Sequence, residues 1–342
     1  MRVDMPGNNG RAAVVAGLGA ALPSRVVSNE ELSRRLNTSD EWIRSRTGIG
    51  QRHVIDAGMA TSDLAVTAGS RALKSAGTTE VDAVVLATTT PDRPCPATAP
   101  DVADRLGIAA VPAFDIAAVC SGFIYGLAVG AGLIATGVAD SVLVIGADTY
   151  STIIDPDDRT TAAIFGDGAG AVVLRAGAPD EAGALGPFDL GSDGAQADLI
   201  TIPAGGSRQR STGEPAGPGD QYFRMQGKRV FKNAVLRMVG STRTVLDRAG
   251  WLVDDVDHLV AHQANYRILT EVAAELAIPE ERVVSNIARV GNTSAASIPL
   301  ALADAALADA LRPGQRVLLT AFGGGLTWGS TVLRWPDITA VA

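Results

Sequence analysis

The chain alternates between short continuous runs of apolar residues and longer segments in which apolar residues recur at helical spacing. The runs at residues 12–19, 81–87, 141–147 and 169–174 predict strands that are buried on both faces. Residues 62–76 have the apolar spacing of a helix. Strands that alternate with helices in this way indicate an α/β fold with mostly buried sheets.

Two short motifs mark where these elements turn or begin. Gly17-Leu18-Gly19 matches a fragment of a dinucleotide-binding fingerprint, but Pro23 follows it and no helix opens there. We therefore predict a turn at these glycines and not a phosphate-binding loop. Thr38-Ser39-Asp40-Glu41 has the pattern of a capping box, which predicts the start of a helix that carries Trp42 and Arg46.

The second half of the chain repeats the apolar pattern of the first half in the same order. In both halves a helix that ends in Ala-Gly precedes an apolar strand, which starts at Val81 in the first half and at Val256 in the second. Further matches pair residues 116–120 with 287–291, 142–145 with 317–320, and 170–175 with 329–334. Chance matching of short apolar strings is the alternative, and the shared order disfavours it. We predict two duplicated α/β halves, residues 1–176 and 177–342.

Residues 116–139 are uncharged over a length that could span a membrane. The segment contains a turn and several glycines, however, and no interfacial residues flank it. A helix that is apolar all round is also typical of the centre of a large protein. We therefore predict a buried central helix here, and no membrane association.

Composition narrows the classes of function. The 342 residues carry a formal net charge of -8, which disfavours broad binding to nucleic acid or to a membrane surface. Cys95 and Cys120 are the only cysteines, so the chain has neither a disulfide framework nor the cysteine spacing of a metal site. This low cysteine content fits a protein that works in the reducing cytoplasm. Residues 1–11 are polar and lack the apolar core of a signal peptide.

The middle of the chain combines a long loop with a basic segment. Residues 202–220 are rich in Gly, Pro, Ser and Arg, and we predict a flexible cover there, not a domain linker. Residues 221–240, called the basic segment below, contain no acidic residue. Their cations are Arg224, Lys228, Arg229, Lys232 and Arg237. Such charges could be only a solvated helix face, but on an acidic protein they favour an acidic partner.

Cys120 lies at the junction between a strand-like apolar run and the uncharged helical segment that follows it. At the N-terminus of a helix the free backbone N–H groups and the helix dipole favour an anion, so a thiolate is stabilised there. The thiolate is the reactive form of cysteine. The alternative is a buried structural cysteine, which is a common fate of this residue.

Three further segments offer complementary chemistry. His262 follows an apolar strand and precedes polar residues, a place suited to proton or hydrogen-bond chemistry, although a lone histidine can be structural. Asn292 lies in a turn of small residues, where it could be only a helix N-cap. Residues 322–325, Phe-Gly-Gly-Gly, offer bare backbone N–H groups for an oxyanion, or only a tight turn. If the halves pack about a pseudo-two-fold axis, Cys120, His262 and Asn292 converge.

Together these segments resemble the β-ketoacyl-[acyl-carrier-protein] synthase III family of the thiolase superfamily. The resemblance extends from about residue 12 to residue 335 and depends on the order and spacing of several motifs. These motifs are Glu41–Ile49, Cys120–Phe123, Phe165–Gly170, His262–Asn265, Gly291–Ser297 and Phe322–Gly329.

The resemblance implies a five-layered αβαβα thiolase-like fold, a homodimer and a catalytic triad of Cys120, His262 and Asn292. In such a family an acyl group passes from coenzyme A to the cysteine and is condensed with malonyl-carrier protein, with release of carbon dioxide. The N–H groups of Cys120 and Gly324 would form the oxyanion hole. This chemistry needs no permanently bound cofactor, nicotinamide or metal. An acyltransferase without carbon–carbon bond formation, and a binding module with an inactive site, are the alternatives.

The same resemblance assigns binding residues. By similarity, coenzyme A would be held by Thr38, Trp42, Arg46 and Arg159, with the flat ring and the guanidinium groups suited to an adenine and to phosphates. Cys95, across the dimer, and Phe322 would line the acyl pocket, whose size the sequence leaves open. We expect the acidic carrier protein to dock on Lys228, Lys232 and Arg267.

Overall fold

A computed structural model describes residues 10–342 and contains two main sheets. The first sheet has the order β1-β7-β6-β4-β5, and the second has the order β11-β12-β13-β8. The first consists of β1 (Ala12–Ala21), β4 (Ala83–Ala87), β5 (Ala113–Ile116), β6 (Ser141–Thr149) and β7 (Asp167–Gly177). The second consists of β8 (Leu185–Ser192), β11 (His258–Ala261), β12 (Arg316–Gly323) and β13 (Thr327–Arg334). The expectation of no signal peptide in residues 1–11 falls mostly outside the described range.

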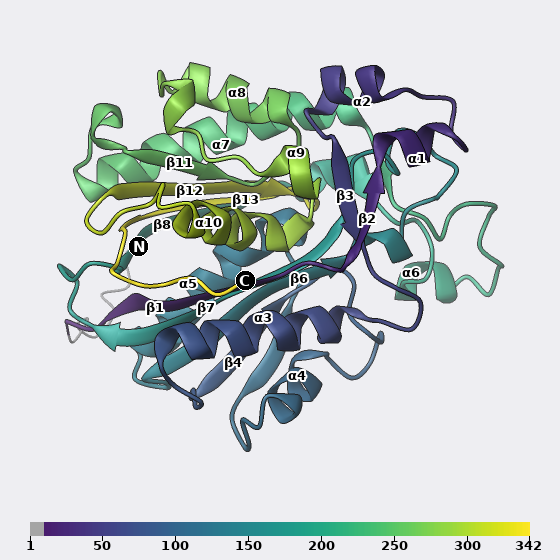
Figure 1. Cartoon of the computed structure of the whole chain (residues 1–342). Coiled ribbons are helices and arrows are strands. Elements are labelled where there is room, and N and C mark those ends of the chain that lie inside the picture. The colour runs from purple at the N-terminus through teal and green to yellow at the C-terminus, as the bar shows by residue number, and fades with distance from the viewer. Residues whose placement is uncertain (1–9) are drawn as a thin grey trace.

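Helices separate and cover the sheets in five layers (Figure 1). Helices α3 (Thr61–Ala76) and α4 (Ala99–Arg105) cover the outer face of the first sheet. Helices α5 (Gly122–Ala135) and α10 (Ser297–Leu307) lie between the sheets. Helices α7 (Gly227–Ala249) and α8 (Tyr266–Glu275) cover the outer face of the second sheet. This is the predicted αβαβα arrangement.

Smaller elements gather at one end of these layers (Figure 1). They are β2 (Arg25–Ser28), α1 (Asn29–Ser33), α2 (Asp40–Thr47), β3 (Gln51–Val54), β9 (Ile200–Thr201), α6 (Ser207–Arg210), β10 (Arg224–Met225) and α9 (Ile287–Val290). The short 3₁₀ turns are η1 (Val119–Ser121), η2 (Tyr150–Thr152), η3 (Gly194–Leu199), η4 (Val253–Asp255), η5 (Glu280–Arg282) and η6 (Ser294–Ala296). The predicted cover, residues 202–220, is mostly exposed and contains only the single turn α6.

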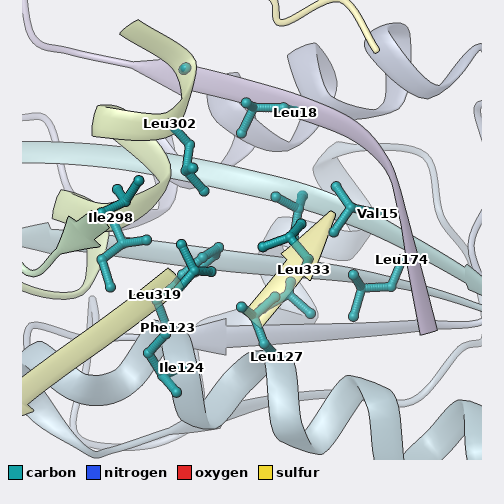
Figure 2. Packing of buried hydrophobic residues seen from close by; sticks show 14 of the residues in the cluster. Val15, Leu18, Phe123, Ile124, Leu127, Leu174, Ile298, Leu302, Leu319 and Leu333 are labelled. Atoms are coloured by element: carbon teal, nitrogen blue, oxygen red, sulfur yellow. The ribbon is translucent and has the colours of Figure 1, made fainter. Parts of the chain in front are cut away.

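The core between the sheets is built around the central helices (Figure 2). Phe123, Ile124 and Leu127 of α5 pack with side chains from α10 and from both sheets. Those partners include Ile298, Leu302, Leu18, Leu174, Leu319 and Leu333. The uncharged segment is therefore a buried central helix, as predicted. Across residues 10–342, no helix combines the length and the apolar character that a membrane crossing needs.

The two sheets share a strand order, which displays the duplication. Strands β4 and β6 are parallel neighbours in the first sheet, as β11 and β12 are in the second. Strands β7 and β13 follow as antiparallel neighbours, with β1 and β8 beyond them. Helices α3 and α7 both end at a left-handed glycine, Gly77 and Gly250, as their Ala-Gly sequences predict. The boundary at residues 176 and 177 stays a prediction.

One predicted match between the halves is wrong. Residues 116–120 contain the end of β5, whereas residues 287–291 contain helix α9. The structural counterparts are the turns η1 and η6, which begin at residues with positive φ, Val119 (48°) and Ser294 (50°), and lead into α5 and α10. Cys120 therefore corresponds to Ala295. A comparison of apolar residues alone does not find this match, because neither Val nor Ser is a residue type that indicates a positive φ.

The predicted turn at Gly17-Leu18-Gly19 is also wrong, since both glycines lie inside β1. Their role is close packing, because α3 crosses the strand at this point. A Cβ atom on Gly17 would lie 2.5 Å from the Ala72 carbonyl oxygen, and one on Gly19 would lie 2.3 Å from that of Ala68. Only glycine lets the helix approach this closely.

Helix α2 begins where predicted but has a different cap. Ser39 is the N-cap, and its hydroxyl accepts a hydrogen bond from the Trp42 N–H at 3.1 Å. The Thr38 hydroxyl is buried and has no hydrogen-bond partner within residues 10–342. The predicted capping box from Thr38 to Glu41 is therefore wrong by one residue. The acidic residues in the first turn stabilise the start of the helix through its dipole instead.

Candidate active site

Cys120, His262 and Asn292 line one cavity of about 40 Å³. The predicted pocket residue Phe322 lines it too. The other walls are mostly apolar and come from Phe165, Ile200, Phe223, Met225, Val230, Ala234, Met238, Ala264 and Ile268. Val230, Ala234 and Met238 of the basic segment recur at helical spacing, but nothing in the sequence indicates that this helix face enters the site. Helical spacing shows burial and not the neighbour that causes it.

Cys120 lies in η1, between β5 and the central helix α5. Burial raises the pKa of its thiol to about 12. The expectation of a resting thiolate is therefore wrong, because the cost of removing a charge from water exceeds the help from the helix terminus. The neutral thiol must lose its proton during any reaction as a nucleophile.

The Cys120 N–H group is available to a bound oxygen atom. The N–H groups of Ser121 and Gly122 donate hydrogen bonds within this turn, whereas the Cys120 N–H group donates to no other residue within 10–342. Gly323, at the end of β12, lies so close that a Cβ atom there would be 2.8 Å from the Cys120 nitrogen. Gly324 follows beside Val119 and Ile200. The bare backbone thus borders Cys120, as the glycine motif predicts.

His262 follows β11 and is buried. Its Nδ1 atom lies 2.6 Å from the Ser297 hydroxyl oxygen, which also accepts a hydrogen bond from the Gln263 N–H at 3.3 Å. Burial lowers the pKa of His262 to about 3, so the imidazole is neutral at physiological pH. A Ser297 hydroxyl that donates to Nδ1 leaves the proton on Nε2.

Asn292 is held by its own turn. Its Oδ1 atom accepts a hydrogen bond from the Ser294 N–H at 2.9 Å, and its Nδ2 group lies 3.5 Å from the Ala264 carbonyl oxygen. Its backbone N–H donates to the Ile164 carbonyl at 2.9 Å. The N-cap of α10 is Ala296, so the alternative of a simple N-cap does not apply to Asn292. With one amide N–H directed at Ala264, the other remains for a group bound in the cavity that Asn292 lines.

The predicted coenzyme A residues form a second group on the surface. The guanidinium carbons of Arg46 and Arg159 lie 5.1 and 5.2 Å from the centre of the Trp42 ring. Arg159 also donates to the Asn37 carbonyl at 2.8 Å, next to Thr38. The chain thus brings together two cations, an aromatic plane and the Thr38 hydroxyl, which has no hydrogen-bond partner among the residues that the structure describes.

The basic segment is less uniform than its sequence suggests. Arg224 pairs with Asp220 at 2.9 Å and Arg237 pairs with Asp193 at 3.3 Å, and both acids lie outside the segment. Lys228, Arg229 and Lys232 have no acidic partner among residues 10–342, and all are exposed. Two of the five cations of the basic segment are therefore paired with acids from other parts of the chain.

Two other predicted residues are placed apart from this group. Arg267, on α8, donates to the Ser45 carbonyl at 2.6 Å and so joins α8 to helix α2. Cys95 is exposed and does not line the cavity of its own chain. Its suggested role in the partner's pocket stays a prediction.

Comparison with known proteins covers nearly the whole chain. Family models described as 3-oxoacyl-[acyl-carrier-protein (ACP)] synthase III and its C-terminal part match residues 114–194 and 246–335. A β-ketoacyl-[acyl-carrier-protein] synthase III from Streptomyces coelicolor is 65% identical, over 97% of this chain and 99% of the relative. The enzyme of that name from Pseudomonas aeruginosa is 58% identical, over 96% and 98%.

Solved structures agree with the sequence matches. The crystal structure of a 3-oxoacyl-(acyl carrier protein) synthase III from Pseudomonas aeruginosa has a TM-score of 0.90 at 57% identity, covering 96% of this chain and 99% of that chain. A priming β-ketosynthase from a polyketide biosynthetic pathway has a TM-score of 0.89 at 34% identity, covering 98% and 99%. The similarity thus spans both sheets and the central helices.

Proposed function

The chain belongs to the 3-oxoacyl-[acyl-carrier-protein] synthase III family, and on that premise we propose how its residues carry out the reaction. The predicted family and the thiolase-like fold are confirmed, as is the class of acyl-transferring condensing enzyme. It catalyses the decarboxylating Claisen condensation that initiates an acyl chain, and transfer without condensation is not favoured.

Acyl loading requires a nucleophile and an oxyanion hole. We assign the nucleophile to Cys120, because it is the cysteine that lines the cavity, whereas Cys95 is exposed. Its sulfur attacks the thioester of acyl-coenzyme A, and the leaving coenzyme A sulfur takes up a proton. We assign the oxyanion hole to the N–H groups of Cys120 and Gly324, an assignment supported by the close approach of the glycine backbone at Gly323 to the Cys120 nitrogen.

Decarboxylation of the malonyl group builds negative charge on its thioester oxygen. The neutral His262 Nε2–H and the Asn292 amide can both donate hydrogen bonds to that oxygen. The carbanion then attacks the acyl group on Cys120, and the cysteine sulfur leaves. An imidazole with a pKa of about 3 suits this role, because it remains a neutral donor throughout.

The substrates enter from the surface groups described above. Trp42 with Arg46 and Arg159 suits the adenine and phosphates of coenzyme A, and the Thr38 hydroxyl adds an unpaired polar group. Lys228, Lys232 and Arg267 suit an acidic carrier protein, with Arg229 as an added cation. The homodimer and the cytoplasmic location remain expectations that follow from the family.

The observation that carries this assignment is that Cys120, His262 and Asn292 share one buried, mostly apolar cavity. The test is mass analysis of malonyl-carrier protein after incubation with enzyme and a short acyl-coenzyme A. A 3-ketoacyl product with carbon dioxide release is expected, and a carrier protein that gains only the acyl group would contradict condensation. His262→Ala and Asn292→Ala should still load Cys120 but lose carbon dioxide release. Wild-type release by both variants would overturn their roles.

A further inference from the structure

The oxyanion hole proposed above joins two segments that lie far apart in the sequence. One is the turn η1, which carries the Cys120 N–H group, and the other is the loop after β12, which carries that of Gly324. The two N–H groups can bind one oxygen atom only if the segments keep a fixed separation and angle, because a hydrogen bond weakens steeply when its geometry is lost. None of the side chains in the proposed reaction joins the two segments.

Two side-chain hydroxyls bridge the segments. Ser121, the residue after Cys120, donates a hydrogen bond to the Ala118 carbonyl at 2.8 Å, and its hydroxyl lies 2.7 Å from that of Thr327. Thr327 is the first residue of β13, and its hydroxyl lies 2.9 Å from the Gly324 carbonyl oxygen and 3.1 Å from that of Ala118. A continuous path of hydrogen bonds therefore connects the turn of the nucleophile to the glycine loop.

The protons of the two hydroxyls fit this path. A hydroxyl has one proton to donate, and its oxygen can also accept. Thr327 can donate to the Gly324 carbonyl while Ser121 donates to the Ala118 carbonyl or to the Thr327 oxygen. The Ser121 side chain is fully buried, and a buried hydroxyl without a partner is costly. The folded protein therefore retains these bonds.

The backbones of the two segments also touch directly, at Gly323. A Cβ atom there would lie 2.8 Å from the Cys120 nitrogen and 2.9 Å from that of Ser121. Glycine permits this approach but has no side chain that could fix the angle between the segments, so the two hydroxyls supply the directional contacts. The angle matters, because a misplacement of about 1 Å in an active site can slow the reaction about 100-fold.

We propose that Ser121 and Thr327 are positioning residues that hold the two halves of the oxyanion hole in register; this rests on the proposed hole at Cys120 and Gly324. Neither side chain lines the cavity, so both act through the backbone and not on the acyl group itself. Loss of either hydroxyl should slow formation of the tetrahedral intermediate and leave the binding of acyl-coenzyme A unchanged.

The test is single-turnover acylation of Cys120 by a short acyl-coenzyme A, followed by mass spectrometry. Thr327→Val removes the hydroxyl and keeps the branched shape, and it should load about 10- to 100-fold more slowly at saturating substrate. The concentration of acyl-coenzyme A that gives half the maximal rate should stay close to wild type. Thr327→Ser keeps the hydroxyl and should recover most of the wild-type rate, whereas Ser121→Ala should be as slow as Thr327→Val.

A second measurement separates positioning from a general loss of structure. After incubation to full acylation, both slow variants should release carbon dioxide from malonyl-carrier protein at close to the wild-type rate, because that step uses His262 and Asn292 in the proposed reaction. Thr331→Val is the matched control. It removes a buried hydroxyl from the same strand, where Thr331 donates to the Pro187 carbonyl at 3.0 Å, and it should load at the wild-type rate.

Wild-type loading by Thr327→Val or by Ser121→Ala would overturn the proposal, and if one variant does not fold the other decides. Equal slowing by Thr331→Val, or an equal loss of loading and of carbon dioxide release, would also overturn it, because the effect would then be one of general structure. A wild-type protein that is not acylated on Cys120 would instead overturn the nucleophile assignment, and this inference with it.

Discussion

Burial changes the chemistry of Cys120 and His262 in opposite directions. Both residues line the same cavity, in which a charged form loses its hydration. The pKa of the thiol rises to about 12 and that of the imidazole falls to about 3. The resting site therefore contains two neutral groups, a thiol and an imidazole, which agrees with the proposed role of His262 as a hydrogen-bond donor.

That Cys120 and His262 share one cavity could be predicted, because each follows an apolar strand and the carboxyl ends of strands converge in α/β folds. Their ionisation could not be predicted, because it depends on burial by other side chains that line the cavity. Those side chains, such as Phe223 and Met238, are distant from them in the sequence. The same applies to Ser294 and Ser297, which the sequence presents as ordinary polar residues. Only the small-residue motif 291–297 could have drawn attention to the two serines.

The depressed pKa of His262 predicts a loss of stability in acid. The unfolded imidazole binds a proton below about pH 6.5, whereas the folded one resists it down to about pH 3, so folding is disfavoured as the pH falls through that range. The wild-type protein should therefore lose about 3 kcal/mol relative to His262→Gln between pH 7 and pH 4. Urea unfolding of both proteins at several pH values measures this, and a pH-independent difference would contradict it.

At the scale of elements, the fold depends on close contacts that apolar patterns do not reveal. The strands and the Ala-Gly helix ends could be predicted because burial and left-handed caps have clear sequence signals. The role of the glycines of β1 has no signal in the local sequence, because it depends on α3, which packs on that strand. The counterpart of Cys120 cannot be found from apolar patterns for a similar reason, since a positive φ at Val119 or Ser294 leaves no signal in the sequence.

Gly19→Ala should destabilise the protein by about 3 kcal/mol, because its Cβ would lie 2.3 Å from backbone atoms of α3. Gly132→Ala is the matched control. Gly132 is exposed on helix α5, and a Cβ there would meet no atom within 4 Å. This control should stabilise the protein by about 0.5–1 kcal/mol, since alanine favours a helix. Equal effects in chemical denaturation would contradict the packing role of Gly19.

At the scale of the whole molecule, the formal net charge of -8 opposes the approach of an acidic partner. The sequence could locate the basic segment, but it could not show that Asp220 and Asp193 neutralise two of its arginines. We therefore propose that docking of the carrier protein depends on the smaller group around Lys228 and Lys232. Such surface charges act mainly on association and are screened by salt.

Lys228→Glu with Lys232→Glu should raise the KM for malonyl-carrier protein about tenfold at low salt, and less at high salt. Acylation of Cys120 from acyl-coenzyme A should remain close to wild type. Lys74→Glu with Arg312→Glu is the matched control, since it makes the same change in net charge at exposed positions outside the basic segment. If both double variants weaken carrier use equally, the effect is one of net charge and the dock lies elsewhere.

The central claim is that Cys120 carries the acyl group between the two substrates. Its most direct test is peptide mass spectrometry after incubation with a short acyl-coenzyme A, before and after addition of malonyl-carrier protein. The Cys120 peptide should gain one acyl mass, lose it on addition of malonyl-carrier protein as the ketoacyl product forms, and remain unmodified in Cys120→Ala. Acylation of Cys95 in place of Cys120, or ketoacyl product formed by Cys120→Ala at the wild-type rate, would contradict the account.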